Sequence, residues 1–201
     1  MAATPMFPLG SVLFPHMPLH LRVFEERYLI MLAELLKAEE TGFGVVLIER
    51  GHEVGGGEHR FRVGTIADIA EIGSQDGFVL LAAVGRTRIE VVDWLADEPY
   101  PRADVREVPE LVWDEALTEQ RDEAERLVRR TLAQASEFTE HLWPADLELS
   151  SDPVAAIWQL AAITPVGELD QVALLRSTSM AELLTRIVEV TADASVGFGA
   201  R

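Results

Sequence analysis

The spacing of apolar residues changes once along the chain, near Pro109. Before Pro109, short runs rich in β-branched residues are separated by turn signals such as Asp76-Gly77, a pattern typical of strands and hairpins. After it, apolar residues recur every three or four positions from Ala124 to Leu142, which predicts a helix. The change of period predicts two units, a β-rich unit over residues 1–110 and an α-helical unit over residues 111–201.

The β-rich half contains one helical stretch between its first two strands. The apolar residues on one face of this helix are Tyr28, Met31, Leu32, Leu35 and Leu36. The expected strands are, in chain order, Ser11–Phe14, Phe43–Glu49, Arg60–Ile72, Phe78–Val84, Thr87–Trp94 and Ala103–Val108. The residues expected in the core of this sheet are Val63, Ile66, Val84, Ile89 and Val105. The order predicts a β-barrel or a strongly bent sheet with one inserted helix.

The second half carries two helix-start signals. Asp152-Pro153 is an N-cap followed by proline at the first helical position, and it predicts a short apolar helix through Ala162. Ser179 stands three residues before Glu182, the spacing of a capping box, at the start of another apolar run. The expected fold class is therefore α+β, with a helical subdomain following the sheet.

Charge and composition exclude several functions. The chain has 17 basic and 34 acidic residues, a formal net charge of −17, which disfavours binding to nucleic acid or to anionic membrane lipid. It has no cysteine, so disulfides, thiolate metal sites and a cysteine nucleophile are excluded. Because no apolar run reaches the length of a membrane helix and no signal peptide is recognisable, we expect a cytoplasmic protein.

Known catalytic motifs are missing from the sequence. It contains no phosphate-binding P-loop, no dinucleotide-binding glycine motif, no zinc-protease motif and no serine nucleophile elbow. Two His–Glu pairs, His52 with Glu53 and Glu58 with His59, flank the three glycines at 55–57 and could offer nitrogen and oxygen ligands. We interpret them as a solvated loop and expect no metal and no cofactor.

Short motifs in a fixed order resemble the N-terminal domain of Lon proteases. They include Phe7-Pro8-Leu9, Val12-Leu13-Phe14-Pro15, Phe24-Glu25-Glu26-Arg27-Tyr28 and Val84-Gly85-Arg86-Thr87-Arg88-Ile89. The resemblance covers essentially the whole chain and implies a PUA-like β-barrel followed by helices, as in the matching region of cereblon. The sequence departs from the family pattern at Glu26, where proline is usual, and at Thr87, where an aromatic residue is usual.

In Lon proteases this domain engages substrate polypeptide, while separate ATPase and peptidase domains perform the chemistry. The resemblance therefore implies a stand-alone bacterial, non-catalytic polypeptide-binding module. A serine–lysine dyad is implausible because the only lysine is Lys37, which lies among glutamates. The expected partners are unfolded or apolar polypeptide segments, with a protease or a chaperone as a further partner, and the expected state is a monomer or weak homodimer. The alternative is a small-molecule or metal-dependent enzyme that uses a cleft between barrel and helices.

The loop from Phe14 to Leu19 is the candidate peptide-binding site. Pro15 and Pro18 remove backbone donors, while Phe14, Met17 and Leu19 bring apolar side chains to a stiff loop. Such a loop either plugs the core or forms an adaptable contact surface, and the sequence leaves both interpretations open.

Overall fold

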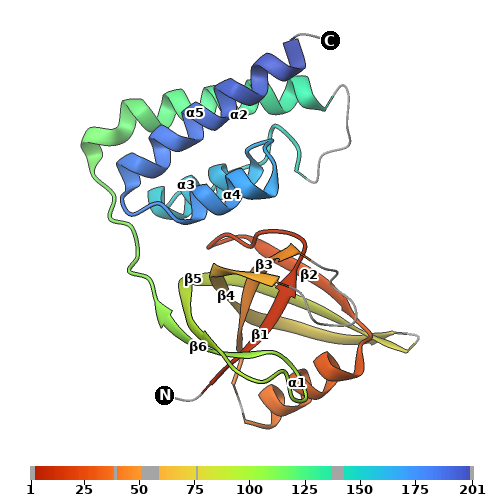
Figure 1. Ribbon diagram of the computed structural model, residues 1–201. Helices are drawn as coiled ribbons and strands as arrows, with labels where there is room; N and C mark the ends of the chain where they lie inside the picture. The colour runs from red at the N-terminus through yellow and green to blue at the C-terminus, as the bar shows by residue number, and fades with distance from the viewer. Residues whose placement is uncertain (1–2, 39, 51–58, 76, 137–142, 200–201) are drawn as a thin grey trace. The chain divides into compact units, whose positions relative to one another are not determined.

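Figure 1 shows a computed structural model in which residues 3–38, 40–50, 59–75, 77–136 and 143–199 are described. The chain divides into two units, Met1–Glu110 and Leu111–Arg201. The first contains the strands and one helix, and the second is helical.

The first unit is built on a six-stranded sheet with one helix. Its elements are β1 (Thr4–Leu9), β2 (Pro18–Val23), α1 (Glu26–Lys37), β3 (Gly42–Arg50), β4 (His59–Gln75), β5 (Phe78–Trp94) and β6 (Arg102–Glu107). The strand order is β2-β5-β4-β3-β1-β6, and β6 also pairs with β5. All strands except β2 therefore belong to a ring of pairings, and β2 is the outermost strand beside β5. The expected α+β fold class is confirmed.

Two strand predictions were wrong. The segment Ser11–Phe14 is not a strand, because residues 10–17 form the connection between β1 and β2, where His16 takes a left-handed φ of 61°. The runs Phe78–Val84 and Thr87–Trp94 are not separate strands, because β5 continues through Gly85. A register irregularity against β4 accommodates the change of pattern at this point.

The interior of the first unit is apolar. The core cluster consists of Met6, Val46, Ile66, Ile89, Val91 and Ala103, with Trp94 and Val105 packed against it. Burial of Ile66, Ile89 and Val63 confirms that part of the expected core, but Val84 is exposed and its assignment to the core was wrong. Its side chain lies on the face of β5 opposite to that of the buried Leu81 and Ala83.

Helix α1 packs through the face that its periodicity predicts. Tyr28, Met31, Leu32 and Leu35 are buried, whereas Leu36, expected on the same face, is exposed. The ring of Phe7 in β1 stacks on Tyr28 with their centroids 3.9 Å apart. The hydroxyl of Tyr100 donates a hydrogen bond of 2.6 Å to the Glu34 carboxylate. The first contact holds the helix against β1, and the second holds it against the connection between β5 and β6.

The second unit is made of helices α2 (Thr118–Ala135), α3 (Pro153–Ile163), α4 (Glu168–Leu175) and α5 (Met180–Gly199), preceded by a short 3-10 turn at Glu115–Leu117. Helices α2 and α5 lie side by side (Figure 1), and Trp158 on α3 is fully buried. The apolar residues that predict this helix are buried from Ala124 to Ala135. The last two of them, Phe138 and Leu142, lie outside the described residues. In the described ranges, no helix is long and apolar enough to span a membrane.

Both predicted helix starts in this unit are confirmed. The Asp152 carboxylate accepts a hydrogen bond from the Ala155 backbone N–H, and the Ser179 hydroxyl accepts one from the Glu182 N–H. The reciprocal half of the capping box differs from the expectation. The Glu182 carboxylate accepts from the Thr178 backbone N–H and hydroxyl, each at 2.7 Å, because Thr178 stands one residue earlier in the turn.

We expect the helical unit to lose stability in acid through Glu182. Hydrogen bonds from the Thr178 backbone and side chain, and from Arg186, lower the pKa of Glu182 to about 2. The bonds favour the charged form, so this stabilisation is complete above the ordinary pKa of 4.5 and is lost as pH falls toward 2. An NMR titration of the Glu182 carboxyl measures the shift directly. The variant Glu182→Gln is expected to unfold at lower urea than the wild type at pH 6 and at similar urea near pH 2.

The matched control is Glu189→Gln, an exposed position on the same helix. It is expected to leave the acid response unchanged. A Glu182 carboxyl that titrates near 4.5 contradicts the prediction.

Candidate functional site

The three sequence-predicted site residues lie at the junction of β1, β2 and β5. Phe14 is 1% exposed and Met17 is 4% exposed, while Leu19 is half-buried in β2. The placement of Phe14 and Met17 favours the interpretation of the loop as a core plug. Peptide binding by these residues stays a prediction.

Backbone hydrogen bonds fix this loop to the sheet. The His16 N–H donates to the Gly85 carbonyl at 2.7 Å, and the Gly85 N–H donates to the Met17 carbonyl at 2.9 Å. The Thr65 hydroxyl on β4 donates to the Leu13 carbonyl at 2.6 Å. A Cβ at Gly85 would stand 2.2 Å from the Phe14 carbonyl oxygen, so the loop approaches β5 as closely as only glycine allows.

An exposed row of apolar side chains lies on β5 next to this loop. Leu80 is 39% exposed and Val84 is 43% exposed, with Ala82 between them on the same face. We refer to these three residues as the apolar row. Successive side chains of a strand point to opposite faces, so the row is the outward face of a segment whose other face is buried.

Strand β2 borders the apolar row on one side. Its residues Arg22, His20 and Pro18 pair in register with Leu80, Ala82 and Val84. Among the described strands β2 pairs only with β5, so its outer edge has no strand beside it. Exposed edges with free backbone groups are where extended polypeptides can add as a further strand.

The two ends of the apolar row differ in charge. At the Leu80 end, the Arg22 guanidinium lies 4.1 Å from the centroid of the Phe78 ring. At the other end, Val84 pairs across the sheet with Asp68 on β4, whose carboxylate forms a 3.0 Å ion pair with Arg86. The row therefore runs from a cationic side chain to a mixed charged cluster.

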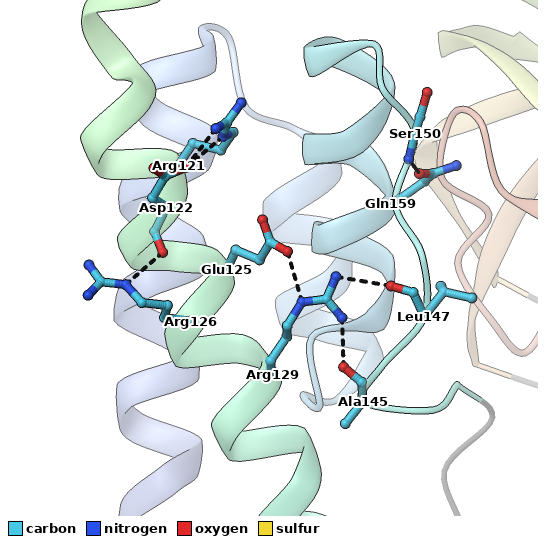
Figure 2. Close-up of polar contacts among 9 residues, drawn as sticks. All are labelled: Arg121, Asp122, Glu125, Arg126, Arg129, Ala145, Leu147, Ser150 and Gln159. Atoms are coloured by element: carbon cyan, nitrogen blue, oxygen red, sulfur yellow. Dashed lines mark hydrogen bonds and ion pairs between the residues drawn. The ribbon is translucent and has the colours of Figure 1, made fainter.

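A shallow polar groove of about 830 Å³ occurs in the helical unit, next to α2. Figure 2 shows that its central side chain, Arg129, points across the groove to the segment that precedes α3. Arg129 donates to Glu125 at 2.8 Å and to the carbonyl oxygens of Ala145 and Leu147 at 2.7 and 3.0 Å. These bonds tie the segment to α2, so we assign Arg129 a structural role.

Buried titratable groups in the first unit also serve structure. Arg88 is buried on β5, and its guanidinium donates a 2.9 Å hydrogen bond to the Pro109 carbonyl. Burial lowers the pKa of Arg88, and the charge of Glu110 opposes this effect. Burial together with the hydrogen bond to Glu34 raises the pKa of Tyr100 to about 12. Each group anchors a chain segment rather than facing a shared cavity.

Of the two His–Glu pairs that flank the glycine-rich loop, the structure describes only His59. His52, Glu53 and Glu58 lie outside the described residues, and His59 is exposed at the start of β4. The described parts of the chain contain no group of three or more histidine or acidic side chains placed to hold a metal ion.

Two solved structures share this architecture. A Lon N-terminal domain protein from Xanthomonas campestris has a TM-score of 0.64 at 22% identity, with 96% of this chain and 98% of that chain covered. The N-terminal domain of Lon protease from the Mycobacterium avium complex has a TM-score of 0.63 at 18% identity, with coverages of 96% and 99%. The architecture is therefore that of Lon N-terminal domains.

The family follows from the sequence match. The model of the ATP-dependent protease La (LON) substrate-binding domain matches residues 3–193, and the chain belongs to this family. A Lon protease from Heliobacterium modesticaldum is 30% identical over 105 residues, which are 51% of this chain and 13% of that protein. The match thus spans a small part of that relative. The resemblance expected from the sequence motifs is confirmed.

Proposed function

We propose that this chain is a non-catalytic module that binds extended, apolar segments of polypeptide. Membership of a substrate-binding domain family supports the class of function. The observation that carries the proposal is the apolar row, an exposed strip on β5 next to β2, whose outer edge pairs with no other strand of the described residues. In this role the chain performs no ATPase or peptidase step. It acts in the cytoplasm and passes its clients to a protease or a chaperone.

An extended segment suits this surface for two reasons. The outer edge of β2 can pair with the backbone of such a segment, and Leu80, Ala82 and Val84, one strand further in, can contact apolar side chains that reach across β2. The surface has little depth, so affinity is expected to be nearer micromolar than nanomolar, on the order of −8 kcal/mol or weaker. The net charge of −17 favours clients with basic flanking residues.

Val84→Glu is expected to weaken binding of an unfolded client about tenfold, because it sets a charge against an apolar segment. Fluorescence anisotropy with a labelled, permanently unfolded protein measures the affinity. Val92→Glu is the matched control, since Val92 is an equally exposed valine of β5 outside the apolar row. It is expected to bind like the wild type.

Equal binding by wild type and both variants would place the client elsewhere. Equal loss in both variants would indicate a general effect of added negative charge. Absence of binding by the wild type to any unfolded client would refute the proposed function.

A further inference from the structure

The ring of strands opens at one end into a cavity of about 450 Å³. Its floor includes the apolar side chains of Ile66, which is 7% exposed, and of Val105, which packs against the core of the first unit. A Cβ at Gly42 would stand 3.3 Å from Ile66 and 3.4 Å from the Asp68 carboxylate, so glycine at this position helps to leave the opening clear. We call this space the mouth cavity. Mouths of β-barrels are common positions for ligand sites.

The rim of the mouth cavity carries three carboxylates and one guanidinium. Glu40, Asp68 and Glu107 contribute negative charge, and Arg86 contributes the positive charge. Arg86 is already paired with Asp68 at 3.0 Å. Glu40 and Glu107 are exposed, so a ligand could reach their carboxylates from solvent. An apolar floor below an excess of carboxylates suits a ligand that joins a cationic ammonium to a short apolar group.

The mouth cavity continues the apolar row. Asp68 lines the cavity, and it pairs in register with Val84, the last residue of the row. Directly paired residues of neighbouring strands project from the same face of a sheet, so a segment lying along the row would reach the cavity without crossing the sheet. The row from Leu80 to Val84 spans about 13 Å of extended strand, the length of four residues.

We propose that the mouth cavity binds the amino-terminal residue of an extended apolar polypeptide. The ammonium group would lie among Glu40, Asp68 and Glu107, and the first side chain would cover Ile66 and Val105. The polypeptide would then run along the apolar row from Val84 toward Leu80, so the placement of the amino terminus sets its direction. This assignment rests on the proposed function and adds a preference for a free terminus and a fixed direction.

The test compares three seven-residue peptide amides of alternating valine and threonine, each with a fluorophore on a C-terminal cysteine. One has a free amino terminus, one is acetylated, and one is acetylated with lysine as its first residue. Anisotropy at pH 7 and low salt is expected to show about fivefold tighter binding of the free terminus than of the acetylated peptide, the size of effect usual for partly exposed charges. The preference is expected to fade as pH rises past about 8, where the terminal amine loses its proton.

Two carboxylate variants localise the effect. Glu107→Gln is expected to reduce the preference for the free terminus to about twofold, while Asp104→Asn, which removes a carboxylate of the same strand outside the cavity, leaves it at fivefold. Val84→Glu is expected to weaken all three peptides together.

Three other results would contradict the terminal site. Equal binding of the free and acetylated peptides overturns the terminal site while the proposed function stands. Equal binding of the lysine peptide and the free-terminus peptide shows a site for any alkylammonium group and overturns the assignment to a terminus. If no peptide and no unfolded client binds, the proposed function fails and this inference fails with it.

Discussion

Replacing Phe14 by alanine is expected to lower the free energy of unfolding by about 3–5 kcal/mol, the range measured for buried aromatic side chains. Phe14 is almost completely buried, and its loop is held by the hydrogen bonds of His16, Met17 and Leu13 to β5 and β4. Because the backbone is fixed on both sides, the structure cannot close the space that the ring leaves. Urea unfolding followed by circular dichroism measures the change.

Leu19→Ala is the control for the Phe14 substitution. Leu19 is only half-buried on the outermost strand, so its truncation is expected to cost about 1 kcal/mol or less. If Phe14→Ala unfolds like the wild type and loses affinity for an unfolded client, the loop is a contact surface and the plug interpretation is wrong. If Leu19→Ala alone weakens client binding, the peptide site extends from the apolar row to this strand.

Gly85→Ala is expected to destabilise the first unit by about 3 kcal/mol, as overpacking of a fixed backbone does. The added methyl group would stand 2.2 Å from the Phe14 carbonyl oxygen and 3.3 Å from Leu13 Cγ. Neither side can yield easily, since Gly85 exchanges backbone hydrogen bonds with His16 and Met17. Denaturant unfolding of the purified variant gives the loss of stability.

The matched substitution is Gly73→Ala on the neighbouring strand β4. The nearest atom to a Cβ at Gly73 is 3.9 Å away, which is ordinary contact, so this variant is expected to be as stable as the wild type or slightly more stable. A Gly85→Ala protein with unchanged stability would mean that the loop is free to move away from β5. If Gly73→Ala also loses stability, the loss in Gly85→Ala would come from a general effect of replacing glycine in a strand and not from the close approach of the loop.

The features that the sequence predicted well are local ones. The N-cap at Asp152 and the hydroxyl cap at Ser179 depend on residues within one helical turn, and the structure has both. The buried face of α1 follows from its apolar spacing for the same reason. Contacts of this kind form between residues a few positions apart, so the local spacing of residues is enough to predict them.

The features that the sequence missed depend on long-range pairing. Val84 looks like a core residue because it stands in an apolar run, and only its place on the exposed face of β5, between β2 and β4, shows that it is not. The sequence left open whether the loop at Phe14 is buried, and only the long-range approach to Gly85 shows that Phe14 is. The mouth cavity joins residues 40, 68, 86 and 107, which no local spacing connects. One signal was present: the run Phe78–Val84 is apolar on both faces, which is unusual for an antiparallel strand with one solvated face.

The contact between Arg88 and Pro109 bears on how the first unit would respond to mechanical force. The chain leaves the sheet after β6, and there the Arg88 side chain binds the Pro109 carbonyl while the Val108 N–H donates to the Arg88 carbonyl at 2.8 Å. Tension applied along the chain from residue 110 must break these two bonds before it reaches the β5–β6 pairing. The two bonds therefore raise the force that a pull on the following segment must reach before it begins to separate β6 from β5.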